Sequence, residues 1–260
     1  VVVIIVSVGW HYAHNPVTKI LEIDIDKRKA SEKSQLNIVM ASDLHLGGLA
    51  GKRFVNKFVN TANNLKPDII LLAGDIASED TWALSKNNFA HALSELNAKY
   101  GVYAVTGNHE YIGGIDFTSN FIEKYCIKIL SDTIIKINNS FYLIGRNDKD
   151  KIKFTGKKRK SLKSILSYKD EDLPIIMMDH QPFNLHEAEK SGIDIQFSGH
   201  THDGQLWPFN YITKKIYEVS NGYIKKGNTH YWISSGYGWW GPPIRTSARP
   251  EIVNIIVNLK

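Results

Sequence analysis

Carboxylate, imidazole and amide side chains occur in five short motifs, each placed directly after a run of apolar residues. The motifs are Asp43-Leu44-His45, Gly74-Asp75, Gly107-Asn108-His109-Glu110, Asp179-His180 and Gly199-His200-Thr201-His202. Short apolar runs are typical of buried strands, and α/β sheets place their chemistry where strands end. The last pair of histidines, taken alone, fits a solvated loop equally well. Five such endings together predict one shared site.

The types of donor atom predict a metal centre. Carboxylate, imidazole and amide ligands suit Mn, Fe, Zn or Co better than an all-oxygen calcium or magnesium cage. Asp43 and His45 lie two apart on extended backbone, so both can hold one ion, and Asp75 can bridge to a second ion completed by Asn108 and His180. Two ions about 3.5–4 Å apart lower the pKa of a shared water and stabilise a phosphoryl transfer. We therefore expect two divalent ions, with Mn, Fe or Zn favoured over Mg or Co, and hydrolysis of a phosphate ester.

His109 follows Asn108 directly, so its ring is not expected to reach the same ion. An imidazole beside the reacting phosphate can protonate the leaving oxygen or stabilise phosphoryl charge. We predict that His109 is catalytic, with an outer hydrogen bond to the site as the alternative. Glu110 is the expected partner that orients His109.

The formal charge of +6 over 260 residues indicates an anionic partner. Residues 146–163 contain nine Lys or Arg and two Asp, so this segment is either a phosphate-facing flap or a solvated loop. Arg146 and Arg245 are candidate substrate ligands, although an ion pair between Arg245 and Glu251 fits equally well. Nucleic acid is not an expected partner, because aromatic residues are not interleaved with the basic segment. The single cysteine, Cys126, excludes an intrachain disulfide.

The hydrophobic periodicity predicts alternating strands and helices followed by short strands. Strands are expected at 20–25, 36–42, 69–73, 102–106, 127–130, 133–137, 141–145, 175–178 and 193–197, and helices at 52–65, 86–99, 117–125 and 162–166. Short strands at 216–219, 222–224, 231–234 and 252–259 are expected to finish a second sheet. No linker divides the chain, so we expect a single domain over 1–260 with a basic insertion at 146–173.

Residues 1–8 are almost all β-branched or apolar, in the order Val-Val-Val-Ile-Ile-Val-Ser-Val. We predict a strand here, with the end of an N-terminal anchor or signal segment as the alternative. No apolar run reaches the roughly 18 residues of a membrane span.

As a set, the five motifs resemble the signature of the calcineurin-like metallophosphoesterase superfamily, from Asp43 to His202. The resemblance implies an α/β fold, a four-layer αββα sandwich of two mixed β-sheets flanked by helices. It also implies a dinuclear site in which Asp43, His45, Asp75 and His202 bind the first metal, and Asp75, Asn108, His180 and His200 bind the second. His109 would be the catalytic histidine.

Residues 42–47, 199–209, 238–245 and 249–252 look like a membrane-associated branch that includes UDP-2,3-diacylglucosamine pyrophosphatases. Asp203 stands where that branch often has glycine. The similarity implies cleavage of a phosphodiester or pyrophosphate, in a lipid-linked or nucleotide substrate, by a membrane-associated or cytoplasmic protein with peripheral membrane contact. A phosphomonoesterase and a catalytically silent metal-binding scaffold are the alternatives.

Overall fold

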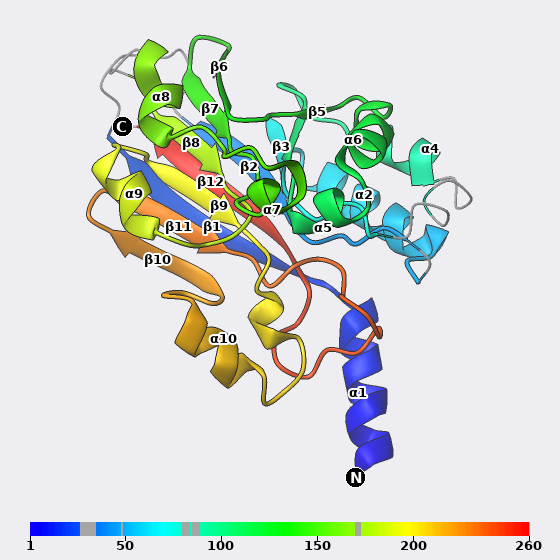
Figure 1. Cartoon of the computed structure of the whole chain (residues 1–260). Coiled ribbons are helices and arrows are strands. Elements are labelled where there is room, and N and C mark those ends of the chain that lie inside the picture. The colour runs from blue at the N-terminus through cyan, green and yellow to red at the C-terminus, as the bar shows by residue number, and fades with distance from the viewer. Residues whose placement is uncertain (27–34, 48, 80–83, 85–88, 170–172, 260) are drawn as a thin grey trace.

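The chain forms two six-stranded mixed sheets (Figure 1), and each of the five motifs follows one of their strands. The computed structural model describes residues 1–26, 35–47, 49–79, 84, 89–169 and 173–259. The first sheet has the order β1 (Val17–Ile25), β12 (Glu251–Leu259), β2 (Gln35–Ala41), β3 (Ile69–Ala73), β4 (Val102–Val105) and β5 (Ile127–Ile129). Its neighbours are parallel except for β12 and β2, which are antiparallel. Strands β2, β3 and β4 therefore end at the same edge.

The second sheet has the order β10 (Gly222–Lys226), β11 (Thr229–Ile233), β9 (Ile195–Ser198), β8 (Ile175–Met178), β7 (Phe141–Gly145) and β6 (Thr133–Ile137). The outer pairs β10–β11 and β6–β7 are antiparallel, whereas β11, β9, β8 and β7 run parallel. The ends of β8 and β9, where the remaining motifs begin, consequently share one edge.

The main core lies between the two sheets. Alternate residues of each strand point to opposite faces, so Ile38 and Met40 of β2 pack in the same apolar cluster as Met178 and Phe197 of the second sheet. Val39 of β2 belongs instead to a cluster on the outer face of the first sheet. The centre of the first sheet is therefore buried on both faces.

Helices cover the two outer faces. On the first sheet, α2 (Lys52–Asn64), α4 (Phe89–Leu93) and α6 (Ile115–Glu123) bury Phe58, Phe89 and Ile122. On the second, α8 (Leu162–Ile165) and α9 (Leu185–Lys190) bury Leu162 and Leu185. Further helical segments among the described residues are α5 (Asn108–Ile112), α7 (Lys151–Thr155), η1 (Leu166–Tyr168), η2 (His202–Gly204) and α10 (Asn210–Ile216). The predicted four-layer αββα sandwich is confirmed.

The prediction of a strand over residues 1–8 is wrong. These residues begin α1 (Val2–His14), which projects from the body (Figure 1). A continuous apolar run without alternation does not distinguish strand from helix. A helix pairs its backbone groups internally, whereas a strand here would need a neighbour in a sheet.

Two predictions near the C-terminus also need correction. Residues 216–219 are not a strand, because α10 extends to Ile216 and the strand that follows is β10. Strand β12 joins the first sheet, between β1 and β2, instead of the second.

The predicted helix at 86–99 appears only as α4, and residues 86–88 lie outside the described residues. None of the helices in the described part of the chain combines the length and apolar character needed to cross a bilayer.

Candidate metal centre

The seven predicted metal ligands and His109 converge where the two sheets meet. The first sheet supplies the residues that follow β2, β3 and β4, and the second sheet supplies those that follow β8 and β9. Ligand atoms group as Asp43–His45–His202, as Asp75–His180–His200 and as His45–Asp75–His109, and within each group they lie within 4.8 Å of one another. Asn108 lines the same cavity as Asp75 and His200. Asp43 and His202, which are 159 positions apart in the sequence, thus belong to one site.

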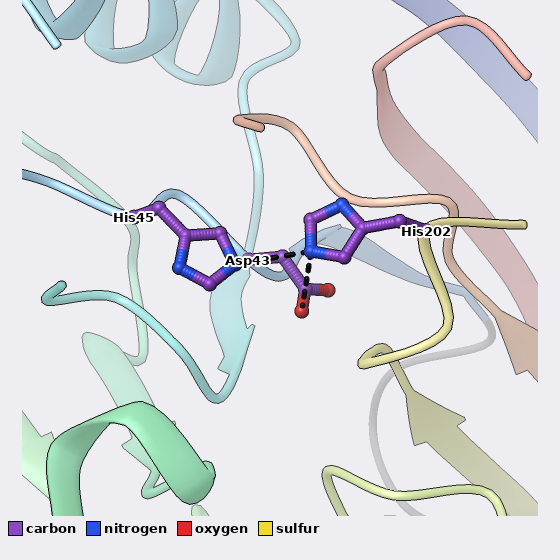
Figure 2. Close-up of side chains that lie close together, drawn as sticks. All are labelled: Asp43, His45 and His202. Carbon is purple, nitrogen blue, oxygen red and sulfur yellow. Dashed lines mark hydrogen bonds and ion pairs between the residues drawn. The ribbon is translucent and has the colours of Figure 1, made fainter. Parts of the chain in front are cut away.

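In the first group, Asp43 and His45 face His202 across the junction of the sheets (Figure 2). His202 Nε2 lies 3.0 Å from His45 Nε2 and 3.5 Å from Asp43 Oδ1. The backbone N–H of His200 donates to both carboxylate oxygens of Asp43, at 3.0 and 3.1 Å. Asp43 is thereby held in place by the second sheet.

In the second group, the His180 ring is oriented by the backbone of the first sheet. His180 Nδ1 lies 2.7 Å from the carbonyl oxygen of Ala73, which can only accept, so Nδ1 carries the hydrogen. When the ring is neutral, the lone pair of Nε2 faces the site, 3.1 Å from Asp75 Oδ2. A backbone carbonyl on the far nitrogen is the usual arrangement for a metal-binding histidine.

Burial sets the charges of these side chains. It lowers the pKa of His45 to about 3 and that of His200 to about 4, and it holds the pKa of His202 well below its usual value. These imidazoles are therefore neutral near pH 7, the form that binds metal. Burial raises the pKa of Asp43 to about 6, with Asp75 adding to the rise and His180 opposing it.

Asp75 and His180 behave differently because they face each other. Burial would raise the pKa of Asp75, but the charge of His180 and its hydrogen bond lower it overall. Burial would lower the pKa of His180, but Asp75 raises it well above its usual value. The space between them attracts one positive charge, which either a proton or a metal ion supplies.

Two polar atoms support the fit of metal ions. Asn108 Oδ1 is buried and has no hydrogen-bond partner among the described residues, and buried His180 Nε2 has only the carboxylate of Asp75 beside it, at 3.1 Å. Buried polar atoms without partners are rare in folded proteins. Both atoms belong to predicted ligands of the second ion, and both are donors that a divalent transition metal accepts.

The His109 side chain is oriented by Glu79, which the sequence analysis did not identify. His109 Nδ1 lies 2.8 Å from Glu79 Oε2, and the two rings of His109 and His45 meet edge to face. Partial burial would raise the pKa of Glu79, but hydrogen bonds from its own backbone and from His109 lower it overall. The only signal in the sequence is an acidic residue four positions after Asp75, on the same loop.

Glu110, the predicted partner of His109, has another role. Its buried carboxylate accepts the backbone N–H groups of Asp75 at 3.0 Å, Gly107 at 2.7 Å and Ala77 at 2.9 Å. Glu110 therefore ties the loop after β3 to the loop after β4. The prediction that Glu110 orients the His109 ring is wrong, because the Glu110 carboxylate accepts hydrogen bonds from the backbone of these two loops.

The backbone of the site is held in an unusual conformation. Left-handed φ values, between +46° and +71°, occur at five predicted ligands: Asp43, His45, Asp75, His200 and His202. Such values are uncommon outside glycine and cluster at functional sites. Gly199 is not among the residues with positive φ; it is needed for space, since a Cβ there would lie 2.3 Å from Asp43 Oδ2.

Both arginines predicted to bind substrate are buried in internal contacts. Arg146 Nη1 lies 2.9 Å from Glu187 Oε2 and 3.3 Å from Asp179 Oδ2. Arg245 donates to the carbonyl oxygens of Ser235 and Gly236, and its Nη1 lies 3.3 Å from His202 Nδ1. Neither arginine is among the residues that line the cavity at the site.

The basic segment is anchored at its base and exposed at its tip. Arg159 Nη1 pairs with Asp179 Oδ1 at 2.8 Å, and Lys153 pairs with Asp150 at 2.9 Å. Helix α7 in this segment contacts α5, which begins with Asn108 and His109, and Phe154 stacks on Tyr111. The exposed lysines of the segment are Lys153, Lys157, Lys158, Lys160 and Lys163.

Two cavities open beside the ligands and share Glu79 and Trp240. The larger has a volume of about 570 Å³ and is lined by Asp75, Asn108, His109, His200 and His202, with Ile112, Phe209 and Trp240 as its large apolar side chains. The smaller has a volume of about 190 Å³ and is lined by His45, Leu49, Ser78, Trp239 and Gly241 besides the two shared residues. The candidate site thus borders two cavities with shared lining residues.

Residues 36–204 match the family described as Calcineurin-like phosphoesterase. A metallophosphoesterase of Helicobacter pylori is 33% identical over 224 residues, which are 84% of this chain but only 58% of that protein. A metallophosphoesterase of Campylobacter jejuni is 32% identical over 99% of this chain and 68% of its own length. A transmembrane protein with metallophosphoesterase domain from Bos taurus is 29% identical over 94% of this chain and 58% of its own.

A solved structure shows the same fold. NAD nucleotidase of Haemophilus influenzae superimposes with a TM-score of 0.53 at 16% identity, over 83% of this chain and 49% of that one. An identity this low shows the shared architecture alone. With the sequence match extending over both groups of ligands, the chain belongs to the calcineurin-like metallophosphoesterases, which are metal-dependent phosphoester hydrolases that use a dinuclear divalent metal centre.

Proposed function

We propose that the protein hydrolyses a phosphodiester or pyrophosphate bond at a pair of divalent metal ions. The observation that carries this proposal is the position of Asp75, which belongs both to a ligand group with His45 and to one with His180 and His200. Asp43, His45, Asp75 and His202 would hold one ion, and Asp75, Asn108, His180 and His200 the other. Such a pair lowers the pKa of a shared water and offsets negative charge on the phosphoryl group.

The protein side chains would supply orientation and a proton. His109 lines the larger cavity beside Asp75, and its Nδ1 faces Glu79. A carboxylate on Nδ1 fixes the ring so that Nε2 is the nitrogen available to the substrate. We infer that His109 Nε2 hydrogen-bonds the leaving oxygen and donates a proton to it, and that Glu79 keeps the ring in this orientation.

The shape of the site favours a substrate with groups on both sides of phosphorus. A monoester has one organic group, whereas a diester or pyrophosphate has two. The two cavities share Glu79 and Trp240; His45 lines the smaller one and His109 the larger one, and these two rings meet edge to face. The larger cavity, with its apolar residues Phe209 and Trp240, also suits a substrate with an apolar part, such as a lipid-linked nucleotide.

The test compares bis-p-nitrophenyl phosphate, p-nitrophenyl phosphate and UDP-2,3-diacylglucosamine as substrates, with Mn, Zn, Fe or Mg added. We expect kcat/KM to be at least tenfold higher for a diester or pyrophosphate than for the monoester. The Asp75→Asn variant should bind at most one ion and lose turnover. A preference for the monoester would establish the alternative phosphomonoesterase. A protein that binds two ions but turns over none of the three would be a metal-binding scaffold.

A further inference from the structure

The N-terminal helix exposes apolar side chains on every side. Only Gly9 and Ala13 of α1 are buried. The large apolar side chains from Val1 to Val8 are between 44% and 93% exposed. A helix that is apolar all round is normally surrounded by other apolar groups. Something other than the described part of the chain is therefore expected to cover α1.

A second group of exposed apolar residues lies on α10 and the loops next to it. Six side chains, three of them aromatic residues outside any helix, are more than half exposed: Trp207, Phe209, Tyr211, Ile212, Ile216 and Trp240. Helix α10 also exposes Lys214 and Lys215. Tryptophan, tyrosine and lysine next to aliphatic residues are typical of segments that lie in the interface of a membrane.

Hydrogen bonds join these two groups into one surface. The backbone N–H of Arg245 donates to Gly9 O of α1 at 2.9 Å, and that of Thr246 donates to Gln205 O at 3.0 Å. Gln205 Nε2 in turn donates to Trp240 O at 2.6 Å. Helices α1 and α10 project at the same end of the molecule (Figure 1). We call this surface the apolar end face; it comprises residues 1–12, 207–216 and 240.

Basic residues surround the base of α1, where it joins the body. Lys57 Nζ donates to His14 O at 3.1 Å, and Arg249 Nη2 donates to Asn15 O at 2.7 Å. The Arg249 guanidinium also lies over the Tyr12 ring. Cations thus lie next to the apolar residues of both helices: Lys57 and Arg249 at the base of α1, and Lys214 and Lys215 on α10. Cations beside exposed apolar groups complement the negative charge of phospholipid headgroups.

We propose that the apolar end face docks on a lipid bilayer that contains anionic phospholipids. The 13 residues of α1 span about 20 Å, so this helix can reach into the apolar layer, which is about 30 Å thick. Helix α10 and Trp207 lie at the headgroup level. Phe209 and Trp240 belong both to this face and to the larger cavity, so the cavity opens next to the bilayer.

Docking itself does not depend on the proposed function; only the delivery of a lipid-borne phosphoester to the cavity rests on it. The test is therefore binding, measured by sedimentation of the full chain with vesicles of phosphatidylcholine containing a quarter phosphatidylglycerol. One variant combines Ile4→Glu and Val8→Glu on α1, and another combines Trp207→Ser and Ile212→Glu. Control variants carry Ile20→Glu or Phe117→Ser, at exposed apolar residues outside the face.

We expect each double variant to need at least tenfold more lipid for half-maximal binding, and each control to stay within twofold of the parent. Pure phosphatidylcholine vesicles should bind the parent less tightly, and so should 0.5 M salt, because screening weakens the contact of lysines with headgroups. Hydrolysis of bis-p-nitrophenyl phosphate without vesicles should be equal in all of these proteins, which separates this test from that of the proposed function.

Equal binding by the parent and both double variants would overturn the proposal, as would a parent that does not sediment with vesicles. A stable dimer in analytical ultracentrifugation that the double variants dissociate, with no vesicle binding, would assign the face to a second copy of the chain. Equal binding to vesicles with and without phosphatidylglycerol would overturn the part of the proposal that concerns anionic lipid.

Discussion

At the level of single residues, His109 is the side chain on which proton transfer in the proposed reaction depends. His109 lines the larger cavity. It is not one of the seven residues proposed to bind the metal ions. We expect His109→Ala to retain both metal ions and to lower kcat by about 10²–10⁴-fold, with a much smaller change in KM. The check is metal analysis with steady-state kinetics on esters of good and poor leaving groups. A decrease of equal size for p-nitrophenol and for a poor leaving group would assign His109 to charge stabilisation instead.

Glu79 should act through His109 and not by itself. Its carboxylate lies 2.8 Å from His109 Nδ1 and is about half exposed. We expect Glu79→Gln to lower kcat roughly tenfold while KM and metal content stay unchanged, and to have almost no effect when His109 is already alanine. Glu79→Asp, which keeps the charge, should recover part of the activity. Additive effects of the two substitutions would show that Glu79 has a separate role.

The predictable part of the site is the set of residues that follow buried strands. Asp43, Asp75 and His180 could be placed because an apolar run fixes where a strand ends, and parallel strands bring their ends to one edge. Glu79 could not be found in this way, because it lies within a polar loop whose path the hydrophobic pattern does not fix. The burial of Arg146 and Arg245 was missed because an arginine beside a phosphate site and an arginine that binds backbone carbonyls look alike in sequence.

At the level of elements, the loops at strand ends are packed so closely that one methyl group should disturb the site. A Cβ at position 199 would lie 2.3 Å from Asp43 Oδ2 and 2.4 Å from Ser42 Oγ. We expect Gly199→Ala to lower the free energy of unfolding by about 1–3 kcal/mol and to weaken metal binding. Gly51→Ala is the control, since its added Cβ would meet nothing within 4 Å. Urea unfolding and metal titration of both variants would check this, and equal stability would contradict it.

The prediction that the basic segment contacts substrate concerns the exposed lysines at its tip. Arg159 forms an ion pair with Asp179, so a variant that tests substrate contact should keep Arg159. We expect neutralising Lys157, Lys158 and Lys160 to glutamine to raise KM for a nucleotide diphosphate roughly fivefold at low salt, with p-nitrophenyl phosphate unaffected. Neutralising the exposed lysines Lys99, Lys124 and Lys128 is the matched control. Equal KM values for the variant and the parent would leave the segment as a solvated loop.

The elements that were predicted wrongly are those whose state depends on distant partners. The alternation in 20–25 specifies a strand locally, and the short apolar run in 69–73 fits a strand covered on both faces; both strands are present. Residues 1–8 and 216–219 carry no such alternation, and only the available neighbours decide between helix and other structure. Strand β12 lies beside β1 and β2, more than 200 residues earlier in the chain, a pairing that no local pattern specifies.

At the level of the whole molecule, metal ions would fasten the two sheets to each other. Each proposed ion takes ligands from both sheets, for example Asp43 with His202, and Asp75 with His180. Metal at about a hundredfold excess over Kd adds about 2.7 kcal/mol per site. We expect Mn or Zn to raise Tm by roughly 5–10 °C for the first ion bound. Differential scanning calorimetry with and without a chelator checks this, with Asp75→Asn losing most of the rise and His91→Ala keeping it.

The left-handed backbone at five predicted ligands predicts which substitutions would accumulate if the site lost its function. Asp43, His45, Asp75, His200 and His202 each adopt positive φ, which costs about 1–3 kcal/mol at a non-glycine residue. Glycine or asparagine adopts that conformation more readily. In a lineage released from the need for hydrolysis, each such replacement would therefore gain stability while removing a ligand. Inactive descendants should accumulate Gly and Asn at these five positions, and regaining the reaction would require several destabilising steps at once.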